Sequence, residues 1–219
     1  MDKVCRKLTV DFVDLHKDLV TEFSKYTSVM EYYRTTRWSN EPICRLMTPY
    51  PMASEHRASI SKPEFYTPAK KGMTEETTDF IAYTIRNIWG NPNSMVFMKS
   101  QFAETTSDCV KELICRIQEH EQNYHLEKIE MCLAWKSPKF KLKQHKDSVQ
   151  DWQKSAVRYH CIIKSNPNNF LYSGDDPDNM NQYLVSAGEI WALDTAQYHK
   201  ACNLSDNEDC LHFIVDFIA

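Results

Sequence analysis

Three segments in the first 125 residues have the hydrophobic pattern or the boundary signals of α-helices. Residues 8–26 and 105–120 carry apolar side chains three and four positions apart, which places those side chains on one helical face. Residues 74–90 begin with a threonine and early acidic residues and end on a glycine, which are typical of helix boundaries. The apolar positions of the helix at 8–26 are Leu8, Phe12, Leu15, Leu19 and Phe23. Those of the helix at 105–120 are Val110, Leu113, Ile114 and Ile117.

The pattern changes after about residue 126. Short runs that are apolar or alternate between apolar and polar follow one another, and turn residues such as "SNPNN" and "SGDDPDN" separate them. Short strands at this spacing predict an antiparallel barrel or jelly roll of about eight strands. We expect an α+β fold in one integrated domain: a mainly helical portion at 1–125 packed outside a β core at 126–219.

Composition and charge narrow the classes of partner. The chain is 42% hydrophobic and 26% charged, with a formal net charge of −4 and scattered lysines and arginines. This balance favours neither nucleic acid nor a membrane surface as a partner. No apolar run approaches the roughly 20 residues that cross a bilayer, and the first residues lack a signal-peptide pattern. The eight cysteines show no Cys-x-x-Cys pair, which favours reduced thiols in a cytoplasmic protein over a zinc cage.

A His-Lys-Asp tripeptide occurs twice. The first copy falls within the predicted helix 8–26, where positions i and i+2 point about 200° apart. His16 and Asp18 therefore cannot hold one ion, and we expect them on a solvated helix face. The second copy lies in the β-rich half, where i and i+2 project to the same side of an extended chain. His145 and Asp147 are thus able to bind one metal ion together.

A second histidine from another strand would complete a set of two imidazoles and one carboxylate. This set leaves coordination positions open on Fe(II) for a cosubstrate, a substrate and oxygen. The candidates are His160, His199 and His212, and each of them alone would more often be a hydrogen-bonded structural histidine.

Several segments in order resemble the core of one enzyme family. They run from 145 to 217 and read "HKDS", "VRYHCIIKSNP", "YLVSAGEIWALD", "YHKACNLSDNED" and "CLHFIVDF". Together they resemble the double-stranded β-helix of the aspartyl/asparaginyl β-hydroxylases and free-proline hydroxylases, which are Fe(II)- and 2-oxoglutarate-dependent oxygenases. The resemblance covers about residues 130–217, and the N-terminal half shows none.

The resemblance implies roles for individual residues. It makes His145, Asp147 and His199 the iron ligands, and it points Arg158 and His160 toward the carboxylate of the cosubstrate or the substrate. Gly188, Glu189, Trp191 and Asp194 would form the turn and strand that lead to His199, with Trp191 mainly packing in the core. A carboxylate at position 147 favours hydroxylation or another oxidation over halogenation.

The chain departs from the family pattern at Cys210. The family has an arginine there, whose guanidinium binds the far carboxylate of 2-oxoglutarate through two hydrogen bonds. A neutral thiol cannot replace it, so Cys210 is at most a pocket residue. Three explanations stand open: another cation takes over, 2-oxoglutarate is not used, or the barrel is a binding module. The candidate cations are Arg158, Lys143 and Lys154.

The resemblance therefore implies a non-haem iron dioxygenase or hydroxylase that uses Fe(II), O₂ and 2-oxoglutarate. Its expected substrate is a small molecule, an amino acid or an amino-acid derivative. The alternatives are an iron oxidase independent of 2-oxoglutarate, a non-catalytic cupin-like binding protein, and a zinc or nickel isomerase that uses the same ligands.

Overall fold

The structure is a computed structural model, and its description covers six stretches of the chain. These are residues 5–27, 81–86, 94–101, 106–122, 129–147 and 157–217.

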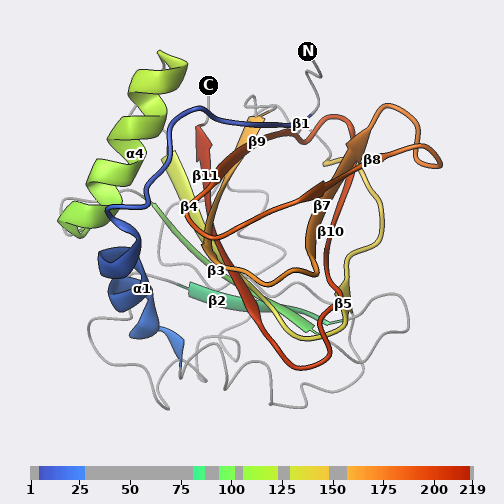
Figure 1. Cartoon of the computed structure of the whole chain (residues 1–219), viewed down its shortest axis with the longest axis horizontal. Helices are drawn as coiled ribbons and strands as arrows, with labels where there is room; N and C mark the ends of the chain where they lie inside the picture. The colour runs from blue at the N-terminus through green and yellow to red at the C-terminus, as the bar shows by residue number, and fades with distance from the viewer. Residues whose placement is uncertain are drawn as a thin grey trace, which may run out of the picture.

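Two antiparallel sheets make up most of the described fold (Figure 1). The larger sheet has seven strands in the order β1-β9-β6-β11-β4-β3-β2, and the smaller has four in the order β5-β10-β7-β8. The strands are β1 (Cys5–Lys7), β2 (Ile81–Arg86), β3 (Ser94–Gln101), β4 (Ile129–Lys136), β5 (Phe140–Lys141), β6 (Val157–Lys164), β7 (Asn169–Gly174), β8 (Asn181–Leu184), β9 (Ile190–Asp194), β10 (Tyr198–Asn203) and β11 (Cys210–Phe217).

The strands from β4 to β11 pair in a nested way. β7 pairs with β8, β6 with β9, β5 with β10 and β4 with β11, all antiparallel. This part of the chain therefore behaves as one long hairpin whose two arms wind together and pass back and forth between the sheets. That topology confirms the predicted double-stranded β-helix.

The outer face of the large sheet is covered by two helices, α1 (His16–Ser24) and α4 (Asp108–Glu121) (Figure 1). Apolar side chains of both helices join those of β4, β6, β9 and β11 in one buried cluster. Phe23 of α1, for example, stacks on Phe213 of β11 with ring centroids 5.0 Å apart. Burying one such side chain contributes about 1.5–3 kcal/mol, so this cluster fixes the helices on the sheet.

The inner face of the large sheet meets the small sheet. One apolar cluster joins Ile162 of β6 to Leu171 of β7, and a second joins Ala134 of β4 to Phe140 of β5. Several polar side chains are also buried here, among them histidines, asparagines and a lysine. Buried polar groups normally have hydrogen-bond partners, and a cluster of them between two sheets is a candidate functional site.

The predicted helices have three different outcomes. The helix at 105–120 is confirmed as α4, with its predicted apolar side chains buried. The helix at 8–26 is shorter than predicted, because residues 5–7 pair with β9 and the helix begins only at His16. Leu8 and Phe12 still reach the outer cluster, from a non-helical segment.

The predicted helix at 74–90 is wrong for its described part. Residues 81–86 form β2, which pairs with β3 along its whole length. Ile81, Tyr83 and Ile85 are β-branched or aromatic residues at alternate positions, a pattern that also suits a strand. Pairing with the sheet outweighs the local helix signals, and the rest of 74–90 lies outside the described residues.

The large sheet draws strands from both predicted portions of the chain. β1, β2 and β3 come from before residue 126 and extend the sheet at its two ends. The described part of the N-terminal portion thus holds strands besides α1 and α4, and the division at residue 126 stays a prediction.

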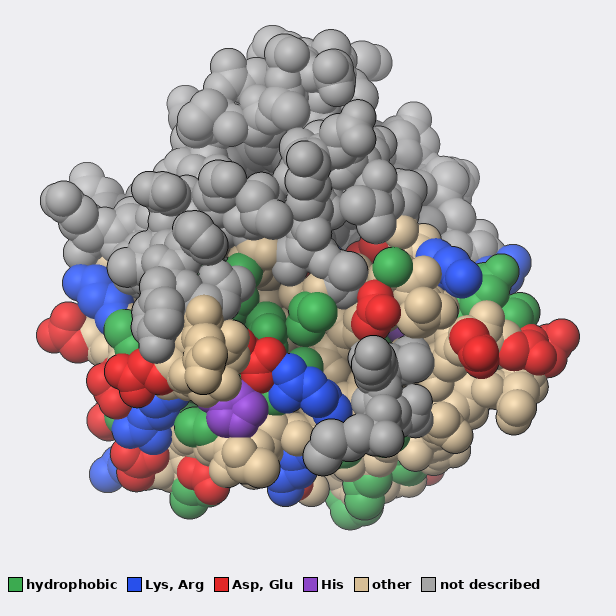
Figure 2. All heavy atoms as spheres, turned by 90° about the horizontal axis from the view of Figure 1, so that it is seen from above, with side chains coloured by type: hydrophobic (Ala, Val, Ile, Leu, Met, Phe, Trp, Pro, Cys, Tyr) green, Lys and Arg blue, Asp and Glu red, His purple; other side chains and the backbone are tan. Residues whose placement is uncertain are grey.

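Acidic and basic side chains are intermingled on the described part of the face seen in Figure 2. Among the helices in the described stretches, none combines the length and the apolar composition that crossing a bilayer requires.

Candidate metal centre

The pairing of β5 with β10 continues far enough to bring two of the predicted histidines together. His145 and His199 lie directly opposite each other in an antiparallel bridge, and each backbone N–H donates to the other's carbonyl at 3.1 and 2.9 Å. Their ring centroids are 4.3 Å apart. The backbone N–H of Asp147 donates to the Thr195 carbonyl at 3.0 Å, which fixes the next turn of this edge.

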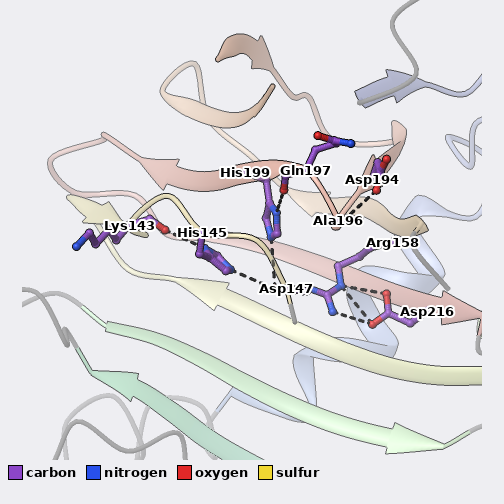
Figure 3. A network of polar contacts seen from close by, with 9 residues as sticks. All are labelled: Lys143, His145, Asp147, Arg158, Asp194, Ala196, Gln197, His199 and Asp216. Atoms are coloured by element: carbon purple, nitrogen blue, oxygen red, sulfur yellow. Dashed lines mark hydrogen bonds and ion pairs between the residues drawn. The ribbon is translucent and has the colours of Figure 1, made fainter. Parts of the chain in front are cut away.

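Three side chains converge on one point at this edge (Figure 3). Asp147 Oδ1 lies 3.3 Å from His145 Nε2 and 3.7 Å from His199 Nε2. One ligand atom from each of the three residues lies within 4.8 Å of the others. As predicted for an extended chain, positions 145 and 147 project to the same side.

Both imidazoles are oriented through their other nitrogen. His145 Nδ1 donates to the Lys143 carbonyl at 2.9 Å, and His199 Nδ1 donates to the Gln197 carbonyl at 3.0 Å. A carbonyl only accepts, so each neutral ring carries its proton on Nδ1 and turns the lone pair of Nε2 toward Asp147. This is the tautomer and the ring orientation of metal-binding histidines.

The second oxygen of Asp147 is held by an arginine. Arg158 Nη1 lies 3.0 Å from Asp147 Oδ2, and the same guanidinium bonds to Asp216 on the neighbouring strand β11 at 3.0 to 3.2 Å (Figure 3). The resemblance directed Arg158 to a ligand carboxylate. In the structure the side chain bridges two carboxylates of the protein itself, because it lies opposite Asp216 in the sheet register.

The charges around the centre favour the ligand form of Asp147. Burial would raise the pKa of its carboxyl, but the hydrogen bond that a protonated His145 donates and the positive charge of Arg158 hold the pKa far below its usual range. Burial lowers the pKa of His199. Burial has the same effect on His145, but its protonated form also donates from Nε2 to Asp147. That bond, the bond to the Lys143 carbonyl and the charge of Asp147 together outweigh burial, so the pKa of His145 is raised.

A chain of hydrogen bonds runs deeper between the two sheets, from Lys136 to His160. Lys136 Nζ donates to Asn169 Oδ1 at 2.5 Å, so the amide nitrogen of Asn169 faces His212 Nε2 and donates to it at 3.0 Å. His212 must then carry its proton on Nδ1, from which it donates to His160 Nδ1 at 3.2 Å. His160 in turn carries its proton on Nε2, and this buried N–H has no partner among the described residues.

Burial is the main reason that both of these deeper histidines are neutral. It lowers the pKa of His160 and of His212 well below the usual value, and nearby positive charges lower them further. A neutral His160 with an unused N–H donor can serve an anionic or carbonyl ligand. His160 and His212 belong to this chain of hydrogen bonds and are not part of the cluster at Asp147.

The remaining predicted residues are buried or turn-forming. Cys210 is fully buried, and its sulfur accepts a hydrogen bond from Asn166 at 3.1 Å. Trp191 packs on the inner cluster and donates from its indole to Glu189 at 2.9 Å. Asp194 caps the turn before β10 by accepting from the Ala196 N–H at 2.9 Å.

Two further residues named from the sequence are Gly188, before β9, and His16, in the first His-Lys-Asp copy. Gly188 has a φ of 88°, a conformation that strongly favours glycine. His16 is half-buried and does not lie on a solvated face, because its Nε2 bonds to the Ile163 carbonyl at 2.7 Å. Neither His16 nor Asp18 belongs to the described metal-binding cluster.

Sequence reasoning missed three residues of this region: Lys136, Asn169 and Asp216. Lys136 ends a strand that reads as apolar, and a lysine at a strand end is normally solvated. Alternation along "CLAWK" would have placed Lys136 on the same face as Cys132 and Ala134, and that was the available signal.

Comparison with known proteins adds solved structures of similar fold only. No family model matches the chain, and no curated protein sequence does. A prolyl-4-hydroxylase from Pseudomonas putida aligns with a TM-score of 0.47 at 12% identity, over 57% of this chain and 72% of its own. A 2OG-Fe(II) oxygenase family oxidoreductase from Burkholderia pseudomallei aligns with a TM-score of 0.47 at 6% identity, over 63% and 72%.

A vicilin from Solanum melongena also aligns, with a TM-score of 0.36 at 13% identity, over 56% of this chain and 26% of its own. Likenesses this distant carry no argument about function, which has to come from the site itself.

Proposed function

We propose that the protein is a non-haem Fe(II)-dependent oxygenase that uses 2-oxoglutarate and O₂. The observation that carries the proposal is the convergence of two imidazole lone pairs and one carboxylate oxygen on a single point. A metal cation between these three electron-pair donors would be attracted by all of them at once. Two histidines and one carboxylate are the donor set of non-haem Fe(II) oxygenases, so the residues present fit the metal.

The roles of the protein groups follow from their contacts. His145, His199 and Asp147 would hold the metal, and Arg158 would keep the carboxylate of Asp147 ionised and oriented. His160 would offer its unused Nε2–H to a ligand carboxylate. Bound Fe(II) with 2-oxoglutarate would supply the activation of O₂ for attack on a C–H bond.

We further propose a small substrate, an amino acid or a derivative of one, and a place in the aspartyl/asparaginyl and free-proline hydroxylase group. The support is the motif order along 145–217 together with the site geometry. A cytoplasmic location is part of the same proposal.

The first experiment measures metal binding. Protein loaded anaerobically with Fe(II) should bind one ion per chain, and His145→Ala or His199→Ala should abolish binding. His16→Ala serves as the control, because it removes an imidazole on the outer face of the large sheet. Equal loss in all three variants, or no binding in the unaltered protein, would overturn the proposed centre.

The second experiment asks what the loaded protein does. Adding 2-oxoglutarate without oxygen should give a weak metal-to-ligand charge-transfer band in the visible region, and a screen of amino acids should then reveal oxygen uptake. Iron binding without this band would favour the second candidate, an oxidase independent of 2-oxoglutarate, which the thiol at Cys210 suggests. Activity without oxygen would point to an isomerase, and iron-free purified protein to a binding module.

A further inference from the structure

Lys136 is a buried cation whose charge has no anionic partner among the described residues. Its relative exposure is 1%, and it shares the inner face of β4 with Ala134 and Cys132. Its ammonium donates to the neutral amide of Asn169, and none of the described carboxylates lies within ion-pair distance of it. Lysine is almost never fully buried without a partner, because removing the charge from water is costly. The arrangement points to an anion that the site is built to receive.

The position of Lys136 in the sheet relates it to the missing arginine. β4 and β11 pair in a register that sets Lys136 directly opposite Cys210. Side chains directly opposite in an antiparallel pair lie on the same face, with Cβ atoms about 5 Å apart. A cation on β4 therefore projects from the strand beside the one where the resembled family has its arginine, onto the same face.

Lys136 also lies on the same inner surface as the metal centre. Its partner Asn169 is opposite Asn203 on β10, and Asn203 follows His199 by four residues on the same strand face. This separation is about 13 Å along the strand. His160 stands between the two ends: the hydrogen-bond chain from Lys136 ends at its ring, and Arg158, two residues earlier on the same strand, contacts Asp147.

We propose that Lys136 binds the far carboxylate of 2-oxoglutarate in place of the arginine that Cys210 replaces. The inference rests on the proposed function and deepens it, because it makes the cosubstrate a 2-oxo acid with a second carboxylate. The keto acid end would lie at His145, Asp147 and His199, and the other end at the Lys136 ammonium. Asn169 then holds the Lys136 ammonium in place by accepting one hydrogen bond. The other two N–H donors of the ammonium are left for the ligand. The three cations named from the sequence, Arg158, Lys143 and Lys154, are not needed for this contact.

The experiment compares two keto acids of equal chain length. Protein loaded anaerobically with Fe(II) is titrated with 2-oxoglutarate and with 2-oxopentanoate, which lacks the far carboxylate, and the charge-transfer absorbance gives each Kd. Truncating one partner of a buried charge pair weakens binding by about 30- to 5,000-fold, and the unaltered protein should prefer 2-oxoglutarate by a factor in this range.

The variant Lys136→Met keeps the length of the side chain and removes the charge. It should weaken 2-oxoglutarate binding to the level of 2-oxopentanoate and leave 2-oxopentanoate binding unchanged. Lys17→Met, at an exposed position on α1, is the matched control and should retain the preference.

The outcomes separate this inference from the proposal beneath it. If the unaltered protein binds both keto acids with equal affinity, the proposed role of Lys136 is wrong. A full preference for 2-oxoglutarate in Lys136→Met would do the same while leaving 2-oxoglutarate use intact. Absence of the band with either keto acid in the iron-loaded protein would instead remove 2-oxoglutarate use, and the inference with it.

Discussion

The substitution Lys136→Met should change the pH dependence of folding stability in a calculable way. Burial lowers the pKa of Lys136 from 10.5 to about 8. The folded protein therefore holds this proton less tightly than the unfolded chain. A pKa lower by about 2.5, at 1.36 kcal/mol per pKa unit, corresponds to about 3 kcal/mol of destabilisation while the lysine is charged.

The sign follows from proton linkage. Below pH 8 the lysine is charged in both states, and the folded state bears the full cost of the buried ammonium. As pH rises from about 8 to 10.5 the folded protein releases the proton first, so this cost disappears. A methionine has no proton to release. The stability of Lys136→Met relative to the unaltered protein should fall by about 3 kcal/mol between pH 7 and about 10.5.

The substitution also leaves Asn169 Oδ1 without its donor. That loss costs about 1–3 kcal/mol, but it does not depend on pH, so only the change with pH reports on the charge. Thiols and phenols away from Lys136 are common to both proteins and cancel in the difference, whereas Cys202 and Cys210 interact with the Lys136 charge, so each is replaced by serine in both proteins.

The assay is urea unfolding of both proteins without iron, at several pH values from 7 to about 10.5. Lys17→Met is again the control, and its stability difference should stay nearly constant, because Lys17 is exposed. A difference that is equally flat for Lys136→Met would mean that the ammonium is well solvated, and the argument for an awaited anion would fail.

Two further predictions concern the metal centre. Arg158→Gln removes the guanidinium that holds Asp147, and we expect Fe(II) affinity to drop about 10- to 100-fold in a protein that still folds by circular dichroism. Unchanged affinity would show that the arginine does not position the ligand. The raised pKa of His145 means that protons compete with the metal there, so Fe(II) affinity in a competition assay should weaken as pH falls from about 8 to about 6. An Fe(II) affinity that is constant between these pH values would show that protons do not compete with the metal at His145.

Local sequence determined much of the β core. Alternating or apolar runs predicted strands where β4, β6, β7, β9 and β11 lie, since a two-residue period reports which side chains face a sheet. The same period placed His145 and Asp147 on one side of the chain without knowledge of the partner strand. The helix prediction was wrong at residues 81–86, because helix-boundary signals report only local preference and pairing with β3 outweighed that preference.

Other features depended on contacts between residues far apart in the chain. The resemblance pointed Arg158 toward a ligand carboxylate, and only the register of β6 with β11 shows that its guanidinium reaches Asp216. The choice of His199 over His160 and His212 rested on a resemblance, and only the bridge to His145 shows which imidazole reaches the aspartate.

The sequence by itself determined the strand-rich half and the His-x-Asp pair. Only the tertiary structure decided that the residue opposite Cys210 is a buried lysine. The physical reason is that a side chain's face follows from local alternation, whereas its partner follows from strand register, which is set by the packing of the whole barrel.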